Sequence, residues 1–212
     1  TIHRATRLSD HRPVAVKVFK GAVTSDGRPD GERAACLAAG NHPHLIPVLG
    51  ELTGHPSGSP GLVMDLIGPE FTTLASPPDF ETCSRDVYPP DARFSLTVVR
   101  NIARGIASAA AALHAQGLMH GDLYAHNILW NPEGDCRLGD FGAATFYPPG
   151  QPAYEKIEVL AFGRLLAELL ARCNESSAPL QTLAARCLSA RPGDRPSFRE
   201  IVDALGSNTD PE

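Results

Sequence analysis

Short apolar runs dominate the first third of the chain, and each has the length of a β-strand. Within the segment 1–20, residues 14–19 are rich in β-branched and aromatic residues, and 45–52 and 62–67 are apolar runs; Gly, Pro and Asp occur between these segments. We predict two short strands in the first segment and one strand in each of the others. Between them, the alanine-rich stretch 31–39 predicts a helix that ends before Gly40.

Helical spacing of apolar residues replaces the strand pattern after Asp91, the predicted N-cap of the first long helix. A proline-rich connection over 68–90 precedes this change, and a short hairpin around Asn131 and Gly134 interrupts it. Ser197 is the predicted cap of the last helix. Strands followed by helices indicate an α+β fold. The predicted helices cover residues 94–116, 155–172, 180–188 and 198–205, and the predicted hairpin strands cover 128–130 and 136–138.

Composition narrows the functional class. The 212 residues are 42% hydrophobic, enough to bury a core in one domain or in two lobes that share a cleft. The formal net charge of −5 and the lack of Lys or Arg runs argue against nucleic-acid binding. No apolar stretch approaches the roughly 18 residues of a membrane helix, and no signal-peptide pattern is present. Five widely spaced cysteines without a Cys-x-x-Cys pair fit free thiols in a cytoplasmic protein better than disulfides or a zinc site.

One ten-residue segment carries a distinctive set of catalytic residue types. It reads His-Gly-Asp-Leu-Tyr-Ala-His-Asn-Ile-Leu over 120–129, and Asp-Phe-Gly follows at 140–142. Asp122 would accept the proton of an attacking hydroxyl, and Asn127 and Asp140 would hold magnesium on the phosphates of a nucleotide. Phosphoryl transfer needs charge neutralised and groups aligned more than it needs covalent help. The spacing therefore indicates phosphoryl transfer.

Three further motifs extend the pattern along the chain: Val-Ala-Val-Lys at 14–17, His-Pro-His-Leu-Ile at 42–46 and Arg-Pro at 195–196. Together with the segment above, they resemble the protein kinase family over nearly the whole sequence. The His-Gly-Asp-Leu-Tyr-Ala-His-Asn loop also resembles that of bacterial kinases linked to leucine-rich repeats. With the high alanine content, that resemblance implies a bacterial source.

The resemblance implies a two-lobed α+β fold with a small, β-rich N-lobe and a larger, helical C-lobe. It places the N-lobe and hinge at residues 1–67, the C-lobe at 68–206 and a disordered tail at 207–212. It also implies ATP and Mg²⁺ as cofactors and a protein as the acceptor.

The resemblance assigns roles at the nucleotide site. Lys17 would hold the α- and β-phosphates and pair with a Glu on the next helix. Glu32 is the candidate partner because it is the only acidic residue on the predicted helix, although direct spacing would place Arg33 there. Asn127 and Asp140 are the implied metal ligands.

The strand at 62–67 resembles the strand that leads to the hinge of a kinase. Met64 would be the gatekeeper, and the backbone of Asp65 and of Leu66 or Ile67 would meet adenine. Leu129, just after the catalytic loop, is a further candidate for the nucleotide site. A buried strand without a ligand fits the local sequence equally well.

Several departures leave the acceptor and the activity open. Gly121 replaces the Arg that usually receives a phosphate from the activation segment. No Gly-rich loop precedes the lysine strand, and we expect it upstream of Thr1, where a further domain could also lie. The segment 142–158 is short and lacks Ala-Pro-Glu. Tyr124 and His126 stand where serine/threonine kinases place Lys and tyrosine kinases place Arg, so the acceptor residue is not specified, and simple packing roles fit them as well.

Three functions follow from these motifs. The first is an active, minimal protein kinase that phosphorylates Ser, Thr or Tyr, favoured because all five catalytic positions have candidates. The second is a pseudokinase that binds or scaffolds, favoured by the short activation segment. The third is a small-molecule phosphotransferase of the aminoglycoside or choline kinase type, suggested by His-Gly-Asp.

Overall fold

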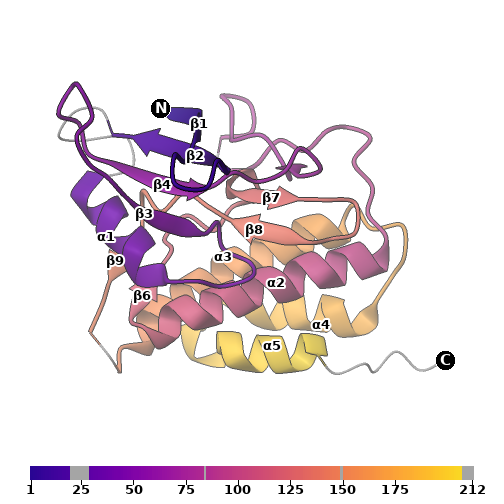
Figure 1. The fold of residues 1–212 in the computed structure, drawn as a ribbon. Coiled ribbons are helices and arrows are strands. Elements are labelled where there is room, and N and C mark those ends of the chain that lie inside the picture. The colour runs from indigo at the N-terminus through magenta and orange to yellow at the C-terminus, as the bar shows by residue number, and fades with distance from the viewer. Residues whose placement is uncertain (20–28, 84, 149, 207–212) are drawn as a thin grey trace.

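The computed structural model describes residues 1–19, 29–83, 85–148 and 150–206. A β-sheet forms the N-terminal part and a group of helices the C-terminal part, with small strands between them (Figure 1). The α+β fold class predicted from the sequence is therefore confirmed. The predicted tail at 207–212 lies outside the described residues.

A four-stranded antiparallel sheet has the order β1-β2-β4-β3. Close packing of the central strands requires a glycine at position 61, because a Cβ there would lie 2.5 Å from the carbonyl oxygen of Lys17. Helix α1 (Pro29–Ala39) follows β2 along the described chain and buries Ala35, Cys36 and Ala39. The strands are β1 (Ile2–Thr6), β2 (Pro13–Val18), β3 (Val48–Leu52) and β4 (Gly61–Asp65).

Helix α2 (Leu96–Ala115) forms the centre of the helical part, and its buried residues recur at helical spacing. The N-cap is Ser95, whose hydroxyl accepts a hydrogen bond from the backbone N–H of Val98 at 3.3 Å. The prediction of Asp91 as the cap is wrong, because the chain turns into the helix four residues later. Gly117 ends the region with a φ of +68°.

Two small strand groups hold the loops between the sheet and the helices. The predicted hairpin is present as β7 and β8, and β5 pairs with β7. β6 pairs with β9, which ties the segment after residue 140 to the segment just before the catalytic loop. The short 3₁₀ helix η1 ends the catalytic loop. The bounds are β5 (Thr72–Thr73), β6 (Leu118–Met119), η1 (Ala125–Asn127), β7 (Ile128–Trp130), β8 (Cys136–Leu138) and β9 (Thr145–Phe146).

Of the remaining helices, α3 and α5 pack against α2, and α4 packs against α3 (Figure 1). Ser197 caps the last helix as predicted: its hydroxyl accepts from the N–H of Glu200 at 3.2 Å, and its own N–H donates to the Glu200 carboxylate at 2.7 Å. The helices are α3 (Pro152–Leu170), α4 (Ala178–Cys187), the 3₁₀ helix η2 (Pro192–Asp194) and α5 (Phe198–Gly206).

All five cysteines are free thiols, as their spacing predicted. Among the described residues, none of the helices combines the length and apolar character needed to cross a bilayer.

Candidate active site

A lysine on the sheet, a glutamate on α1 and an aspartate after β8 meet at one point. Lys17 Nζ donates to the carboxylate of the buried Glu32 and lies 3.3 Å from Oδ1 of Asp140. Arg33 instead faces Asp30 and Glu51 at the surface. The geometry thus places Glu32, and not Arg33, against Lys17.

The two carboxylates set the charge state of this lysine. Partial burial disfavours the ammonium form, but the hydrogen bond to Glu32 and the charge of Asp140 outweigh burial and raise the pKa of Lys17. Lys17 therefore remains a cation at neutral pH. A fixed cation beside an exposed carboxylate is suited to binding phosphate oxygens.

The loop between β6 and β7 carries Asp122 and Asn127 side by side. The Asn127 side-chain amide donates to Oδ2 of Asp122 at 2.8 Å and to its backbone oxygen at 2.9 Å. The hydrogen bond to Oδ2 fixes one carboxylate oxygen of Asp122, while the Asp122 side chain keeps 37% of its surface exposed. An acceptor hydroxyl can therefore reach the Asp122 carboxylate.

His120 braces this loop from behind. Its ring is fully buried, its Nε2 lies 2.9 Å from the backbone oxygen of Gly139, and its ring packs edge-on against Phe141. The backbone N–H of Asp122 donates to Nδ1 of the same ring at 3.3 Å. One imidazole thus couples the catalytic loop to the Asp-Phe-Gly turn, whose Asp140 has a φ of +55°.

Gly121 stands where the chain has no room for a side chain. Its φ is +80°, and a Cβ would lie 2.4 Å from the backbone oxygen of Ala143. Its N–H donates to Oε1 of Glu158 at 2.8 Å. Gly121, at a position where protein kinases usually have Arg, therefore allows the segment after Asp140 to pack closely on the catalytic loop.

Glu158 of α3 anchors the loop through a network that the sequence did not predict. The buried carboxylate also accepts from the N–H of His120 at 3.2 Å and lies 2.7 Å from Nε2 of His114. Nδ1 of His114 is 2.6 Å from the hydroxyl of Tyr147. Burial alone would raise the pKa of Glu158, but the His114 hydrogen bond and the neighbouring imidazoles and N–H groups lower it.

A second unpredicted carboxylate, Asp86, orients His126 beside Asp122. Asp86 accepts from the backbone N–H of His126 at 3.1 Å and lies 2.8 Å from its Nδ1, with only 1% of the Asp86 side chain exposed. Nε2 of His126 is then 3.8 Å from Oδ2 of Asp122. The imidazole stacks on Tyr124. His126 is therefore held on the same side of the loop as the Asp122 carboxylate. No sequence signal indicated Asp86, because it lies in an irregular stretch.

The hinge candidates do not all face the same hollow. Met64 lines a cavity of about 90 Å³ together with Lys17 and Asp140. Asp65, Leu66 and Ile67 line a separate hollow of about 390 Å³. Leu129, half-buried in β7, lies opposite Arg137 and Thr73 and belongs to neither hollow. Of these candidates, the structure brings only Met64 into the cavity of the lysine.

Cys36 of α1 lines the same cavity as Lys17. Burial raises the pKa of its thiol to about 12. The thiol is therefore protonated at neutral pH and forms a neutral wall of the cavity.

Asn127 and Asp140 have the donor types that magnesium prefers. Among the described residues, Oδ1 of Asn127 has no hydrogen-bond partner, because only its amide nitrogen is used. The Asp140 side chain is 48% exposed. Magnesium takes few protein oxygens and keeps phosphate and water ligands, so a pair of this kind fits it.

The segment after Asp140 is short and enters α3 directly at Pro152. Arg195, which in a protein kinase would pair with the Glu of Ala-Pro-Glu, is buried here and bonds to carbonyls instead. Its Nε donates to Ser189 at 2.9 Å and its terminal nitrogen to Lys156 at 2.7 Å. The late Arg-Pro motif thus secures the start of α3 through carbonyls, and no carboxylate of the described residues pairs with Arg195.

The sequence was compared with known proteins. It matches the protein kinase domain family over residues 1–160. A putative cyclin-dependent kinase F-2 from Oryza sativa subsp. japonica is 28% identical over 195 residues, which cover 89% of this chain and 56% of that protein. The serine/threonine-protein kinase Kist of Rattus norvegicus is 32% identical over 115 residues, 52% of this chain and 25% of Kist. The ephrin type-B receptor 3 of Danio rerio is 30% identical over 134 residues, 63% of this chain and 24% of the receptor.

The chain spans between about a quarter and just over half the length of these relatives. All three are eukaryotic, so they do not support the bacterial source inferred from the sequence. The family match covers most of the chain, and it agrees with the α+β architecture and with the grouping of Lys17, Glu32 and Asp140. This protein belongs to the protein kinase family.

Proposed function

We propose that the protein is an ATP- and Mg²⁺-dependent kinase that transfers the γ-phosphate to a Ser, Thr or Tyr hydroxyl of another protein. The observation that carries this proposal is the meeting of Lys17, Glu32 and Asp140 from three separate elements. An unpaired lysine at this depth would be costly, and a structural ion pair would not need a second, half-exposed carboxylate.

The nucleotide side of the reaction falls to Lys17, Asn127 and Asp140. Lys17, held by Glu32, binds the α- and β-phosphates, and Met64 lines the same cavity. Asn127 and Asp140 hold the metal. Bound magnesium neutralises phosphate charge and aligns the phosphate that is transferred. We assign Asp65, Leu66, Ile67 and Leu129 to the adenine side on the family resemblance alone.

The acceptor side falls to Asp122. Its exposed carboxylate oxygen accepts the proton of the attacking hydroxyl, while Asn127 holds the other oxygen in place. His126 lies close enough to fix the direction of this carboxylate or to contact the incoming phosphate. Because Gly121 replaces the usual Arg, the loop is held by Glu158 and does not depend on a phosphate from the activation segment.

We assign residues 1–67 to the N-lobe and hinge and residues 68–206 to the C-lobe. The sheet and α1 then supply Lys17 and Glu32, and the remainder supplies the catalytic loop and Asp140. Five free thiols support a reducing compartment such as the cytoplasm.

The test is transfer of the labelled terminal phosphate of ATP, with magnesium, to the protein itself and to a generic protein acceptor. Asp122→Asn should lower transfer by at least about 100-fold and leave magnesium–nucleotide binding near the parent's, because it removes only the proton acceptor. Asp140→Ala should lower both. If both variants bind nucleotide and transfer phosphate like the parent, the assignment is wrong.

A pseudokinase remains the second candidate, and one observation favours it. The activation segment passes from Phe141 to Pro152 without the Ala-Pro-Glu region that shapes a peptide platform. Nucleotide binding without transfer, in the parent as well as in Asp122→Asn, would support that function.

A further inference from the structure

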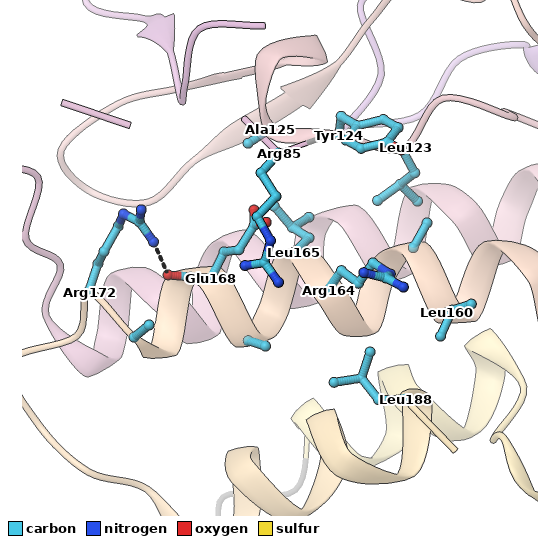
Figure 2. Close-up of a pocket in the computed structure, with 13 residues that line it drawn as sticks. Arg85, Leu123, Tyr124, Ala125, Leu160, Arg164, Leu165, Glu168, Arg172 and Leu188 are labelled. Atoms are coloured by element: carbon cyan, nitrogen blue, oxygen red, sulfur yellow. Dashed lines mark hydrogen bonds between the residues drawn. The ribbon is translucent and has the colours of Figure 1, made fainter. Parts of the chain in front are cut away.

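A pocket of about 340 Å³ opens between the catalytic loop and α3. In Figure 2, Leu123 and Tyr124 lie along its upper edge, α3 runs below them, and Leu188 from the end of α4 closes the lower side. Leu123, the residue directly after Asp122, lines the pocket. It is separate from the cavity of Lys17, and the nucleotide roles proposed above do not use it.

The surface of α3 at this pocket is more apolar than a solvent-facing helix should be. Leu160, Ala161 and Leu188 line it, and Leu188 keeps 37% of its surface exposed. The activation segment joins α3 at Pro152, and none of its described residues lines the pocket. An apolar floor with a charged rim, left open in this way, marks a binding surface.

Two arginines supply that rim from opposite sides. Both Arg85 and Arg164 line the pocket, and Figure 2 shows their guanidinium groups over α3, below Leu123 and Tyr124 of the catalytic loop. Within the described part of the chain, neither guanidinium has a hydrogen bond or salt bridge. Burial raises the pKa of Glu168, and the charge of the nearby Arg85 opposes this only in part. Both cations are therefore available to an anionic ligand.

The other two charged groups of the pocket are already engaged. The Glu168 carboxylate accepts from the hydroxyl of Tyr88 at 3.3 Å. Arg172 donates to the backbone oxygen of Glu168 at 3.0 Å, and its guanidinium lies over the Tyr88 ring at 4.0 Å. The pocket thus carries three cations and one anion in a chain whose net charge is −5. The excess of positive charge attracts an acidic ligand to this pocket.

We infer that this pocket docks the acceptor protein and selects an anionic side chain, a carboxylate or a phosphate, close to the hydroxyl that is phosphorylated. The inference rests on the proposed kinase function and names its substrate class. A peptide whose hydroxyl reaches Asp122 must pass over Leu123 and Tyr124. Because an extended chain advances about 3.3 Å per residue, an acidic residue within roughly three positions of the hydroxyl can reach Arg85 and Arg164. Guanidinium groups bind carboxylate and phosphate oxygens with two parallel hydrogen bonds.

The test measures peptide binding and phosphate transfer separately on the full chain. The probes are fluorescent Ser- and Tyr-containing peptides whose neighbouring positions carry glutamate, phosphoserine or glutamine. We expect the glutamate and phosphoserine peptides to bind at least about tenfold more tightly than the glutamine peptide, with weaker binding at high salt. The double variant Arg85→Gln/Arg164→Gln should abolish this preference. The stronger of the two anionic peptides identifies the charge form that the pocket takes.

A matched double variant, Arg104→Gln/Arg199→Gln, removes the same charge from exposed positions on α2 and α5 and should keep the preference. The preference should also persist in Asp122→Asn, which cannot transfer phosphate. Transfer without an acidic preference, or an equal loss in both double variants, overturns the docking site and leaves the kinase function standing. An acidic preference without transfer supports the site as a peptide-binding pocket and overturns the kinase function.

Discussion

At the scale of single residues, the catalytic loop depends on the absence of a side chain at Gly121 as well as on the carboxylate of Asp122. The positive φ at Gly121 directs its N–H to Glu158 and brings the backbone of Ala143 to within 2.4 Å of a Cβ position. A side chain there would push the activation segment away from the loop. Restoring the Arg typical of the family is therefore no route to phosphate-dependent regulation in this chain.

Gly121→Ala should lower the free energy of unfolding by about 2–4 kcal/mol, the sum of a strained φ and a clash with rigid backbone. Urea denaturation measures this change. Gly193→Ala is the control, because a Cβ at that position meets nothing within 4 Å, and it should change stability by less than about 0.5 kcal/mol. Equal stability of the two variants would contradict the packing of Ala143 on Gly121.

At the scale of elements, α3 acts as the anchor of the catalytic loop through Glu158. The carboxylate binds the N–H groups of His120 and Gly121, and His114 of α2 joins it from the other side. Since the folded protein holds the pKa of Glu158 below the ordinary value of 4.5, the ionised carboxylate stabilises the fold above pH 4.5. That contribution is lost as the pH falls through the folded-state pKa.

Glu158→Gln should therefore cost about 2–4 kcal/mol at pH 7, because it leaves buried N–H groups with a poorer acceptor. Its stability gap to the parent should narrow below about pH 4.5, as the parent carboxylate protonates. Urea denaturation at pH 7 and at about pH 3.5 measures both gaps. Glu133→Gln, at an exposed turn position, should match the parent at each pH. A Glu158→Gln gap that does not change with pH would contradict the ionised anchor.

The sequence predicted most elements because their cause is local. The strands, the hairpin and the four long helices follow from apolar spacing, and Ser197 and Gly40 follow from their capping chemistry. The helix cap at Ser95 was missed because Asp91 is an equally good cap by residue type, and only the tertiary position of the chain decides between them.

The parts of the site that sequence reasoning missed are all contacts between distant residues. Asp86 meets His126 from 40 positions away, and His114 meets Glu158 from 44 positions away. The spacing of apolar residues indicates local structure and does not predict polar contacts between residues so far apart in the sequence. Lys17 and Glu32 could be paired in advance only because the motif fixes the order of their elements.

At the scale of the whole molecule, one cation joins three parts of the fold. Lys17 comes from the sheet, Glu32 from α1 and Asp140 from the turn after β8. A ligand that engages Lys17 and Asp140 together therefore links the N-terminal sheet to the helical part. Its binding should appear as a gain in the stability of the entire chain and not of one element.

Magnesium–ATP should accordingly raise the thermal midpoint of unfolding. At a ligand concentration of 100 times the dissociation constant, the free energy of unfolding should rise by about 2.7 kcal/mol. Removing magnesium with EDTA should reduce the gain, because the Asp140 carboxylate then faces the phosphates without a metal between the like charges, and Asn127 loses the ion it would bind. Asn127→Ala and Asp140→Ala should each lose the magnesium-dependent part, whereas Asp194→Asn, an exposed acid on η2, should keep it. Since the midpoint reports binding without turnover, the measurement tests the metal ligands in an active kinase and in a pseudokinase alike. A magnesium-dependent gain that survives in Asp140→Ala would place the metal elsewhere.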